Sequence, residues 1–166
     1  MHVPQGFCCN LPNWFKRNDY AVNKMSNELI LDAKNQILGR LASYAAKRAI
    51  DGNTVIVLNA DKAIISGKRN NIIEEAKRRL GTRTLGHQEN APIHPRRPDL
   101  YFRRVLRGML PRKKAKGRVA FHRVHVYVGV PEEFVGKSTT LVPGADASKL
   151  ISPYMTLQDL ANEIGG

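Results

Sequence analysis

The sequence predicts an α/β fold in which helices cover a small, mostly parallel central sheet. The first indication is "TVIVLNA" at 54–60, a β-branched run without polar alternation, which is typical of a strand covered on both faces. The second is the order of elements before it, because a short strand at 29–31 and a helix at 36–50 complete a strand, helix, strand unit. With 166 residues, 42% of them apolar, the chain is long enough for one core without disulfide or metal.

The remaining elements are predicted from the period of the apolar residues and from the residues that typically begin and end helices. The helix at 36–50 has apolar residues at every fourth position, namely Ile37, Leu41, Ala45 and Ala49, and Gly52 is its natural stop. A short apolar segment ends at Gly67, and further helices are predicted at 70–81, 98–110 and 157–164. Thr156 is the expected N-cap of the last helix. The alternation in "VAFHRVHVYVG", 119–129, predicts a strand.

Two segments between these elements are predicted to be irregular extensions. The stretch 82–98 is rich in Gly and Pro, and it is longer than a compact domain usually tolerates without a purpose. Within it, His94, Arg96 and Arg97 stand among three prolines and predict a stiff, extended arm. Pro111 is expected to end the preceding helix and release "RKKAKGR", 112–118, as a basic loop able to follow a curved anion.

The charge of the chain is strongly and locally positive. Lys and Arg number 27 against 14 Asp and Glu, which gives a net charge of +13. Residues 83–125 hold twelve Lys and Arg but two Asp and Glu, so this stretch alone carries +10 of the total. Charge spread only for solubility would not concentrate in one segment, where it opposes compaction unless counter-charge arrives from outside. A polyanion is therefore the expected partner.

The helix at 98–110 is predicted to have an arginine face and a core face. At 100° per residue, Arg103, Arg104 and Arg107 fall within one arc, and the opposite side holds Phe102, Val105, Leu106 and Met109. Guanidinium groups match phosphate oxygens, so a ridge of arginines fixed by packing suits a sugar-phosphate backbone. A merely solvated face would interleave Glu with Lys, whereas the sequence has no acid between Asp99 and Glu132. The residues expected to contact this polyanion are Lys68, Arg69, Arg83, His94, Arg96, Arg97, Arg103, Arg104, Arg107, Arg112, Lys113, Lys114, Lys116 and Arg118.

Other functions have weak support in the sequence. "SGKRN" lacks the first glycine and the hydroxyl residue of a phosphate-binding loop, and "ILGRLAS" has one glycine where a dinucleotide fingerprint needs three. His122 and His125 would face opposite sides of the predicted strand, which argues against a metal site, and adjacent Cys8 and Cys9 are expected to be reduced thiols. The longest apolar run is too short to cross a membrane. We expect no cofactor and no small-molecule substrate.

A resemblance to a known family appears in two stretches. "RRVLRGMLPRKKAKGRVAFHRVHVYVGVPEEF", 103–134, resembles the thirteenth large-subunit ribosomal protein family, which carries an RGMLP-type phrase before a basic loop and a strand close to "VYVG". "LDAKNQILGRLASYAAKRAIDGNTVIVLNADKAIISGK", 31–68, is similar to the N-terminal half of the same family. The short spacing after Gly67, the "HPRRP" arm and the "VGVPEE" ending are similar to its archaeal and eukaryotic branch.

The resemblance implies a three-layer α/β/α domain that binds large-subunit (23S-type) ribosomal RNA, supports subunit assembly beside neighbouring ribosomal proteins, and is not an enzyme. By resemblance, Arg107, Gly108, Met109, Leu110 and Pro111 form the signature turn, and the arginines and lysines that flank it are the expected RNA contacts. The resemblance also implies a cytoplasmic component of the ribosome. Residues 25–166 would be the rRNA-binding domain, with its arm and loop at 82–118, and residues 1–24 an extension outside the family pattern.

Two alternatives of other classes stay open at this point. One is an α/β enzyme acting on a nucleotide or RNA, for which Asn59 and Asp61, directly after the buried strand, are the candidate residues. A role in forming a turn is the simpler explanation for both. The other alternative is a general nucleic-acid binder outside the ribosome.

Overall fold

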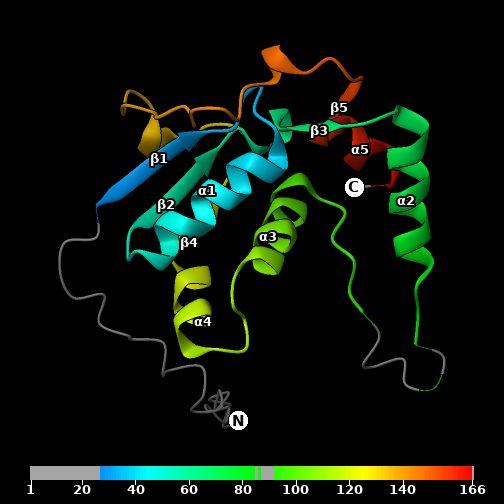
Figure 1. The fold of residues 1–166 in the computed structure, drawn as a ribbon, viewed down its shortest axis with the longest axis horizontal. Helices are drawn as coiled ribbons and strands as arrows, with labels where there is room; N and C mark the ends of the chain where they lie inside the picture. The colour runs from blue at the N-terminus through cyan, green and yellow to red at the C-terminus, as the bar shows by residue number, and fades with distance from the viewer. Residues whose placement is uncertain (1–26, 85, 87–91, 166) are drawn as a thin grey trace, which may run out of the picture.

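A three-stranded parallel sheet forms the centre of the molecule (Figure 1). The computed structural model describes residues 27–84, 86 and 92–165. Strands β1 (Glu28–Asp32), β2 (Thr54–Leu58) and β4 (Val124–Val126) lie in the order β1-β2-β4, with Ile30 opposite Ile56 and Ile56 opposite His125. The strands are parallel because α1 (Leu38–Ile50) returns the chain between the first two. The structure confirms the predicted α/β class and its small parallel sheet.

One face of this sheet is covered by helices. Helices α1, α3 (Pro98–Met109) and α4 (Ala115–His122) pack on it and enclose the larger apolar core. Leu31 and Val57 of the sheet, Leu41 of α1, and Phe102 and Leu106 of α3 are fully buried there. Burying apolar surface is the dominant favourable term in folding, so these contacts fix where α3 lies and which of its sides faces solvent.

The other face of the sheet is covered by an irregular segment. Ile30, Ile56 and Leu58 pack against Phe134, which belongs to a single 3-10 turn, η3 (Glu132–Phe134). Tyr127 adds its ring to this cluster, with its centroid 5.6 Å from that of Phe134. The layer opposite the helices is therefore thin and built from loop residues. The expected α/β/α arrangement has helices on both faces of the sheet, whereas the described residues place helices on one face of this sheet only.

A second, two-stranded sheet joins the C-terminal end of the chain to the core. Strand β3 (Ile64–Ser66), which follows the 3-10 turn η1 (Ala60–Lys62), pairs antiparallel with β5 (Tyr154–Thr156). Helices α2 (Arg69–Gly81) and α5 (Leu157–Glu163) flank it, and η4 (Ala147–Lys149) precedes β5. The Thr156 hydroxyl accepts a hydrogen bond from the Asp159 amide at 3.1 Å, which confirms the predicted N-cap.

The strand predicted over 119–129 was wrong in its first half. Residues 115–122 form helix α4, and pairing in the strand is limited to Val124–Val126. The alternating pattern misled because the buried positions are Gly117, Ala120 and Val124, which recur with helical rather than strand spacing. Val119, expected to share the strand, is 41% exposed.

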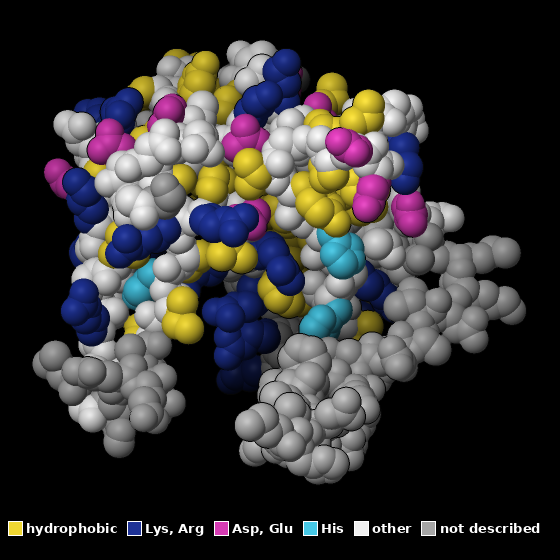
Figure 2. Space-filling model, turned by 180° about the vertical axis from the view of Figure 1, so that it is seen from behind, with side chains coloured by type: hydrophobic (Ala, Val, Ile, Leu, Met, Phe, Trp, Pro, Cys, Tyr) yellow, Lys and Arg dark blue, Asp and Glu magenta, His cyan; other side chains and the backbone are white. Residues whose placement is uncertain are grey.

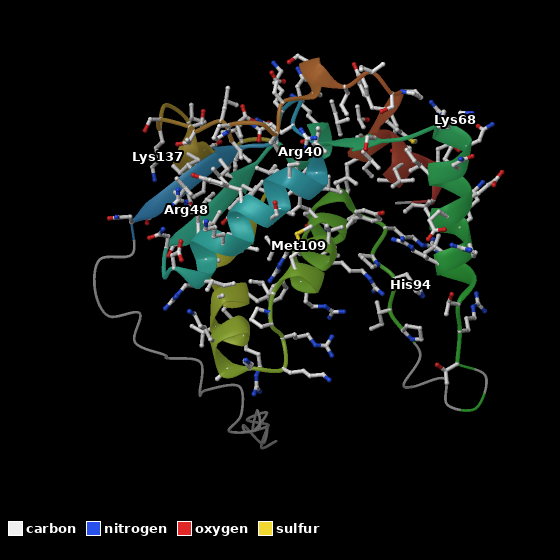
Figure 3. All side chains as sticks on the ribbon, viewed as in Figure 1. Arg40, Arg48, Lys68, His94, Met109 and Lys137 are labelled. Atoms are coloured by element: carbon white, nitrogen blue, oxygen red, sulfur yellow. The ribbon has the colours of Figure 1, made fainter. Side chains whose placement is uncertain are left out.

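Met109 of α3 does not lie where the sequence predicted it. Met109 was predicted on the core face of its helix, but it is 42% exposed and lies over α1 beside Ala46 and Ile50 (Figure 3).

The predictions for residues 1–24, Cys8 and Cys9 included, concern a segment outside the described residues. Within the described ranges, no helix is both long and apolar enough to span a bilayer.

Candidate nucleic-acid interface

The predicted basic surface gathers on one side of the molecule. In Figure 2, Lys and Arg side chains surround a hollow in the lower half, whereas most Asp and Glu side chains lie above it. The arm at 92–97, helix α3 and the turn that leads into α4 meet on this side (Figure 1). Other Lys and Arg side chains lie in the upper half among the acidic ones, but few acidic side chains lie around the hollow, and this raises the local attraction for an anion.

Helix α3 presents its arginines to solvent because its other side is anchored. It begins with Pro98 at its first position and buries Phe102 and Leu106 completely. Arg104 and Arg107 are exposed, as predicted, on the side away from these anchors. Arg103 is only partly exposed, because its guanidinium lies 5.1 Å above the ring of Phe121 on α4. The predicted arginine ridge therefore has two exposed members and one that is partly buried against Phe121.

The basic segment after Pro111 is a fixed turn followed by a helix, which corrects the predicted open loop. Leu110 is buried and ends α3. The Lys114 amide donates to the Pro111 carbonyl at 3.0 Å, and the Arg118 amide donates to the Lys114 carbonyl at 3.3 Å. These bonds hold the backbone of the basic turn, 111–114, in one shape, and this turn includes Arg112, Lys113 and Lys114. The cations are thus presented by an ordered backbone.

Gly117 makes this turn possible, and the sequence analysis did not single it out. A Cβ atom at this position would lie 2.3 Å from the Pro111 carbonyl oxygen and 2.6 Å from its carbonyl carbon. Contacts that short do not occur between real atoms, so only glycine lets α4 approach Pro111 so closely. Gly117 is buried at this contact, six residues beyond the proline that it touches. Local signals could not reveal it, because a glycine in a basic segment predicts only a loop.

Most of the candidate cations around this turn are available to an external anion. The side chains of Arg107, Arg112, Lys113, Lys114, Lys116 and Arg118 form no hydrogen bond or ion pair with any residue that the structure describes. Arg104, Arg107, Arg112, Lys113 and Lys114 line one groove together with Gly108, Leu110 and Pro111. The expected signature turn at 107–111 is in the structure the last residues of α3, 107–109, followed by Leu110 and Pro111. Like charges held this close repel one another, and an anion that binds between them relieves the repulsion.

The arm is held against the rest of the fold by its own polar groups. Arg104 donates to the Ile93 carbonyl at 2.7 Å, and Arg96 donates to the Gly165 carbonyl at 3.4 Å. The His94 ring nitrogen Nε2 lies 3.2 Å from the Thr82 carbonyl oxygen, and Arg97 forms an ion pair with Asp99 at 3.2 Å. Four candidate contacts thus also have partners within the protein.

The structure does not bring every candidate to this surface. Lys68 lies at the start of α2, far from α4 in the view of Figure 3, and neighbouring Arg69 is paired with Glu163 at 2.6 Å. Arg83 follows the opposite end of α2 and is exposed. Lys68 and Arg69 therefore belong to a separate edge of the molecule.

The residues considered for a catalytic role are used in loop structure. Asn59 adopts a left-handed backbone with φ of 55°, and its side-chain amide donates to Asp32 at 2.9 Å. Asp61 accepts a hydrogen bond from the Gly129 amide at 3.3 Å. Both therefore act as turn residues at the carboxyl ends of the strands. His122 ends helix α4 rather than lying in a strand, so the earlier argument about opposite strand faces does not apply to it.

Comparison with known proteins matches this arrangement to one family. The model of the family described as Ribosomal protein L13 matches residues 26–133, which include β1 to β4 and the whole basic surface. The chain belongs to the ribosomal protein L13 family. Membership confirms the resemblance seen in the sequence. It also confirms the expectation of a structural, non-enzymatic protein.

Archaeal members of the L13 family align over most of this chain. Relatives named large ribosomal subunit protein uL13 are 45% identical in Methanopyrus kandleri and 37% identical in Haloarcula marismortui. The alignments cover 82% and 87% of this chain, and 86% and 96% of those proteins. A third uL13, from Aeropyrum pernix, is 40% identical over 141 residues. Their source agrees with the predicted archaeal and eukaryotic branch.

Proposed function

We propose that this chain is a structural protein of the large ribosomal subunit, and that it binds ribosomal RNA through the surface formed by α3, the 111–114 turn and α4. The observation that carries the proposal is the placement of unpaired cations around the signature turn, within the segment matched to the L13 family. We also propose that residues 25–166 act as the RNA-binding domain, and that the chain works in the cytoplasm within the ribosome.

The mechanism is the fixing of phosphate positions. Cations on the turn and on α3 neutralise phosphates where RNA segments converge, and the counterions that those phosphates held are released. Because the turn is held by its own hydrogen bonds and by the Gly117 contact, little backbone ordering has to be completed on binding. The fold then favours one arrangement of RNA backbones, which is how contacts to phosphates position a complex without reading bases.

Sedimentation tests the proposal directly. Cells that express the chain are lysed gently, the extract is separated on a sucrose gradient, and mass spectrometry locates the chain in it. We expect about one copy per large subunit, retained in moderate salt. A chain found only at the top of the gradient would reject the ribosomal role and leave a free nucleic-acid binder. Peptides from 1–24 in the subunit fraction would show that this extension is part of the working protein.

A further inference from the structure

A second groove lies beside the basic one and differs from it in character. It runs between the arm and helix α3, has a volume of about 620 Å³, and is lined by apolar side chains as well as arginines. Ile93 on the arm is 89% exposed and Leu100 on α3 is 44% exposed, so two aliphatic side chains are left bare at this site. The volume falls within the range of pockets that hold small organic ligands.

The charged and aromatic lining of this groove restricts what can occupy it. Arg103, Arg104 and Arg107 line it, and no acidic residue among those that the structure describes does so. The occupant is therefore expected to carry negative charge. Phe121 also lines it, with the Arg103 guanidinium 5.1 Å from its ring centroid. An aromatic ring, aliphatic side chains and guanidinium groups in one groove together suit a ligand that has a planar ring and a phosphate. A single nucleotide has both parts.

The two grooves are continuous through shared residues. Arg104 and Arg107 line both, and the basic groove continues from them along Arg112, Lys113 and Lys114. An RNA backbone following the basic turn would thus pass directly beside the apolar walls of the arm. A paired duplex gains little there, because its bases are stacked inside and its outer surface is sugar and phosphate. An unpaired base can leave the stack and use the apolar walls.

We propose that the groove between the arm and α3 holds an unpaired nucleotide of the bound RNA. Its base lies against Phe121, Arg103 and the aliphatic wall of Ile93 and Leu100, and its phosphate is bound by Arg107. This inference rests on the proposed RNA-binding function and deepens it, because it names the form of RNA that one part of the surface takes.

The test compares a single strand with a duplex. The full chain is titrated into a ten-uridine RNA with one central 2-aminopurine, and into a ten-base-pair RNA duplex, while anisotropy reports affinity. Stacking on an aromatic side chain contributes about 1 to 3 kcal/mol per base, so Phe121→Leu should weaken single-strand binding by about 5- to 150-fold. Duplex affinity should change less than about twofold, because the phosphate contacts remain. The 2-aminopurine emission should change on binding to the wild type and less in the variant.

A second variant covers the case in which Phe121→Leu alters the fold. Ile93→Ser removes an exposed aliphatic wall without touching the core, and its matched control is Ile151→Ser, a fully exposed isoleucine outside the groove. We expect selective loss of single-strand affinity in Ile93→Ser and none in the control.

Three results would overturn the proposal. Equal losses for single strand and duplex in both groove variants would assign the groove to general packing, and the RNA-binding function would stand. An unchanged 2-aminopurine signal in the wild type would show that no base enters. Displacement of the uridine strand by a Glu-Phe repeat peptide at lower concentration would assign the groove to a protein. If the wild type binds neither RNA, the proposed RNA-binding function itself fails.

Discussion

The arm and the basic turn carry similar charge but use it differently. In the arm, Arg96 and Arg97 are bonded to Gly165 and Asp99, and Arg104 of α3 reaches across to the arm backbone at Ile93. In the turn, the side chains of Arg112, Lys113 and Lys114 have no partner among the described residues. Here the backbone, rather than the side chains, makes the local hydrogen bonds.

This difference separates cations that shape the molecule from cations that present charge. A guanidinium that already donates to a carbonyl or carboxylate contributes less to an external phosphate, because part of its donor set is used. A lysine or arginine on an ordered backbone whose side chain has no partner within the protein can direct all its donors and its full charge to an external phosphate. The turn is therefore expected to dominate RNA affinity, and the arm to determine the shape of the surface.

The largest expected effect is the salt dependence of RNA binding. If six to ten phosphates are neutralised, the binding constant for a large-subunit rRNA fragment should fall by about 10³ to 10⁵ between 50 and 200 mM salt, taking the duplex relation as a guide. Filter binding or anisotropy across this range measures the slope. A nearly flat dependence would contradict an interface built on phosphate contacts and would assign affinity to the apolar groove.

The next effect compares the two regions directly. Replacing Arg112, Lys113 and Lys114 by Ala should reduce the slope of log affinity against log salt by about 2.7, since each phosphate contact contributes about 0.9. Replacing Arg96 and Arg97 by Ala removes two positive charges whose side chains already have partners, and should change the slope by less than two such contacts. A larger loss of slope in the arm variant than in the turn variant would reverse the roles given above.

Gly117 tests whether the order of the turn matters as well as its charge. Gly117→Ala places a Cβ atom against the Pro111 carbonyl and should destabilise the fold by about 1 to 3 kcal/mol, as other overpacked sites do. A thermal melt should show a decrease of several degrees, and RNA affinity should fall although no charge is lost. The matched control is Gly39→Ala in α1, where a Cβ atom meets nothing within 4 Å. Equal melting temperatures for the two variants would contradict the close approach.

Sequence reasoning succeeded where structure is determined by short-range pattern. The buried strand at 54–58, helix α1 and the Thr156 cap were all predictable, because apolar period and capping chemistry act within a few residues. The arginine face of α3 was predictable for the same reason, since Phe102 and Leu106 are one turn apart and both buried. The resemblance added the family, which the charge pattern alone did not determine.

Sequence reasoning failed where contacts are long-range. The first half of helix α4, 115–118, reads locally as a loop and its second half, 119–122, as a strand. In the structure Gly117 packs on Pro111 and Ala120 reaches the core, and neither contact can be read from neighbouring residues. The division of arginines into bonded and unbonded sets was also hidden, because Arg96 finds a partner 69 residues away. The same holds for the groove lined by Ile93 and Phe121, which come from separate segments.

A smaller effect concerns the bond that holds the arm. Arg104→Met removes the hydrogen bond to the Ile93 carbonyl, which should cost about 1 kcal/mol locally. Limited proteolysis should cut the arm faster in this variant than in the wild type. The matched control is Arg107→Met, one turn along the same helix, whose side chain has no partner among the described residues. Identical cleavage rates in the two variants would show that the arm is held by other contacts.

The smallest effect concerns arginines outside both regions. On α2, hydrogen bonds and charge from Arg79 and Arg78 lower the pKa of Glu75 from its ordinary 4.5. A lowered folded-state pKa stabilises the fold at pH values above 4.5, and this contribution is lost as the pH falls through the folded pKa. Because the group is exposed, Glu75→Gln should lower the melting temperature only slightly at pH 7, and the difference should vanish in acid. RNA affinity should change little, although two arginines are released, because α2 lies away from the turn (Figure 1). If Glu75→Gln increased RNA affinity as much as the Ala variant of the basic turn decreases it, unpaired cations would contribute to RNA affinity at any position on the surface. The ordered backbone of the basic turn would then not be what makes its cations effective.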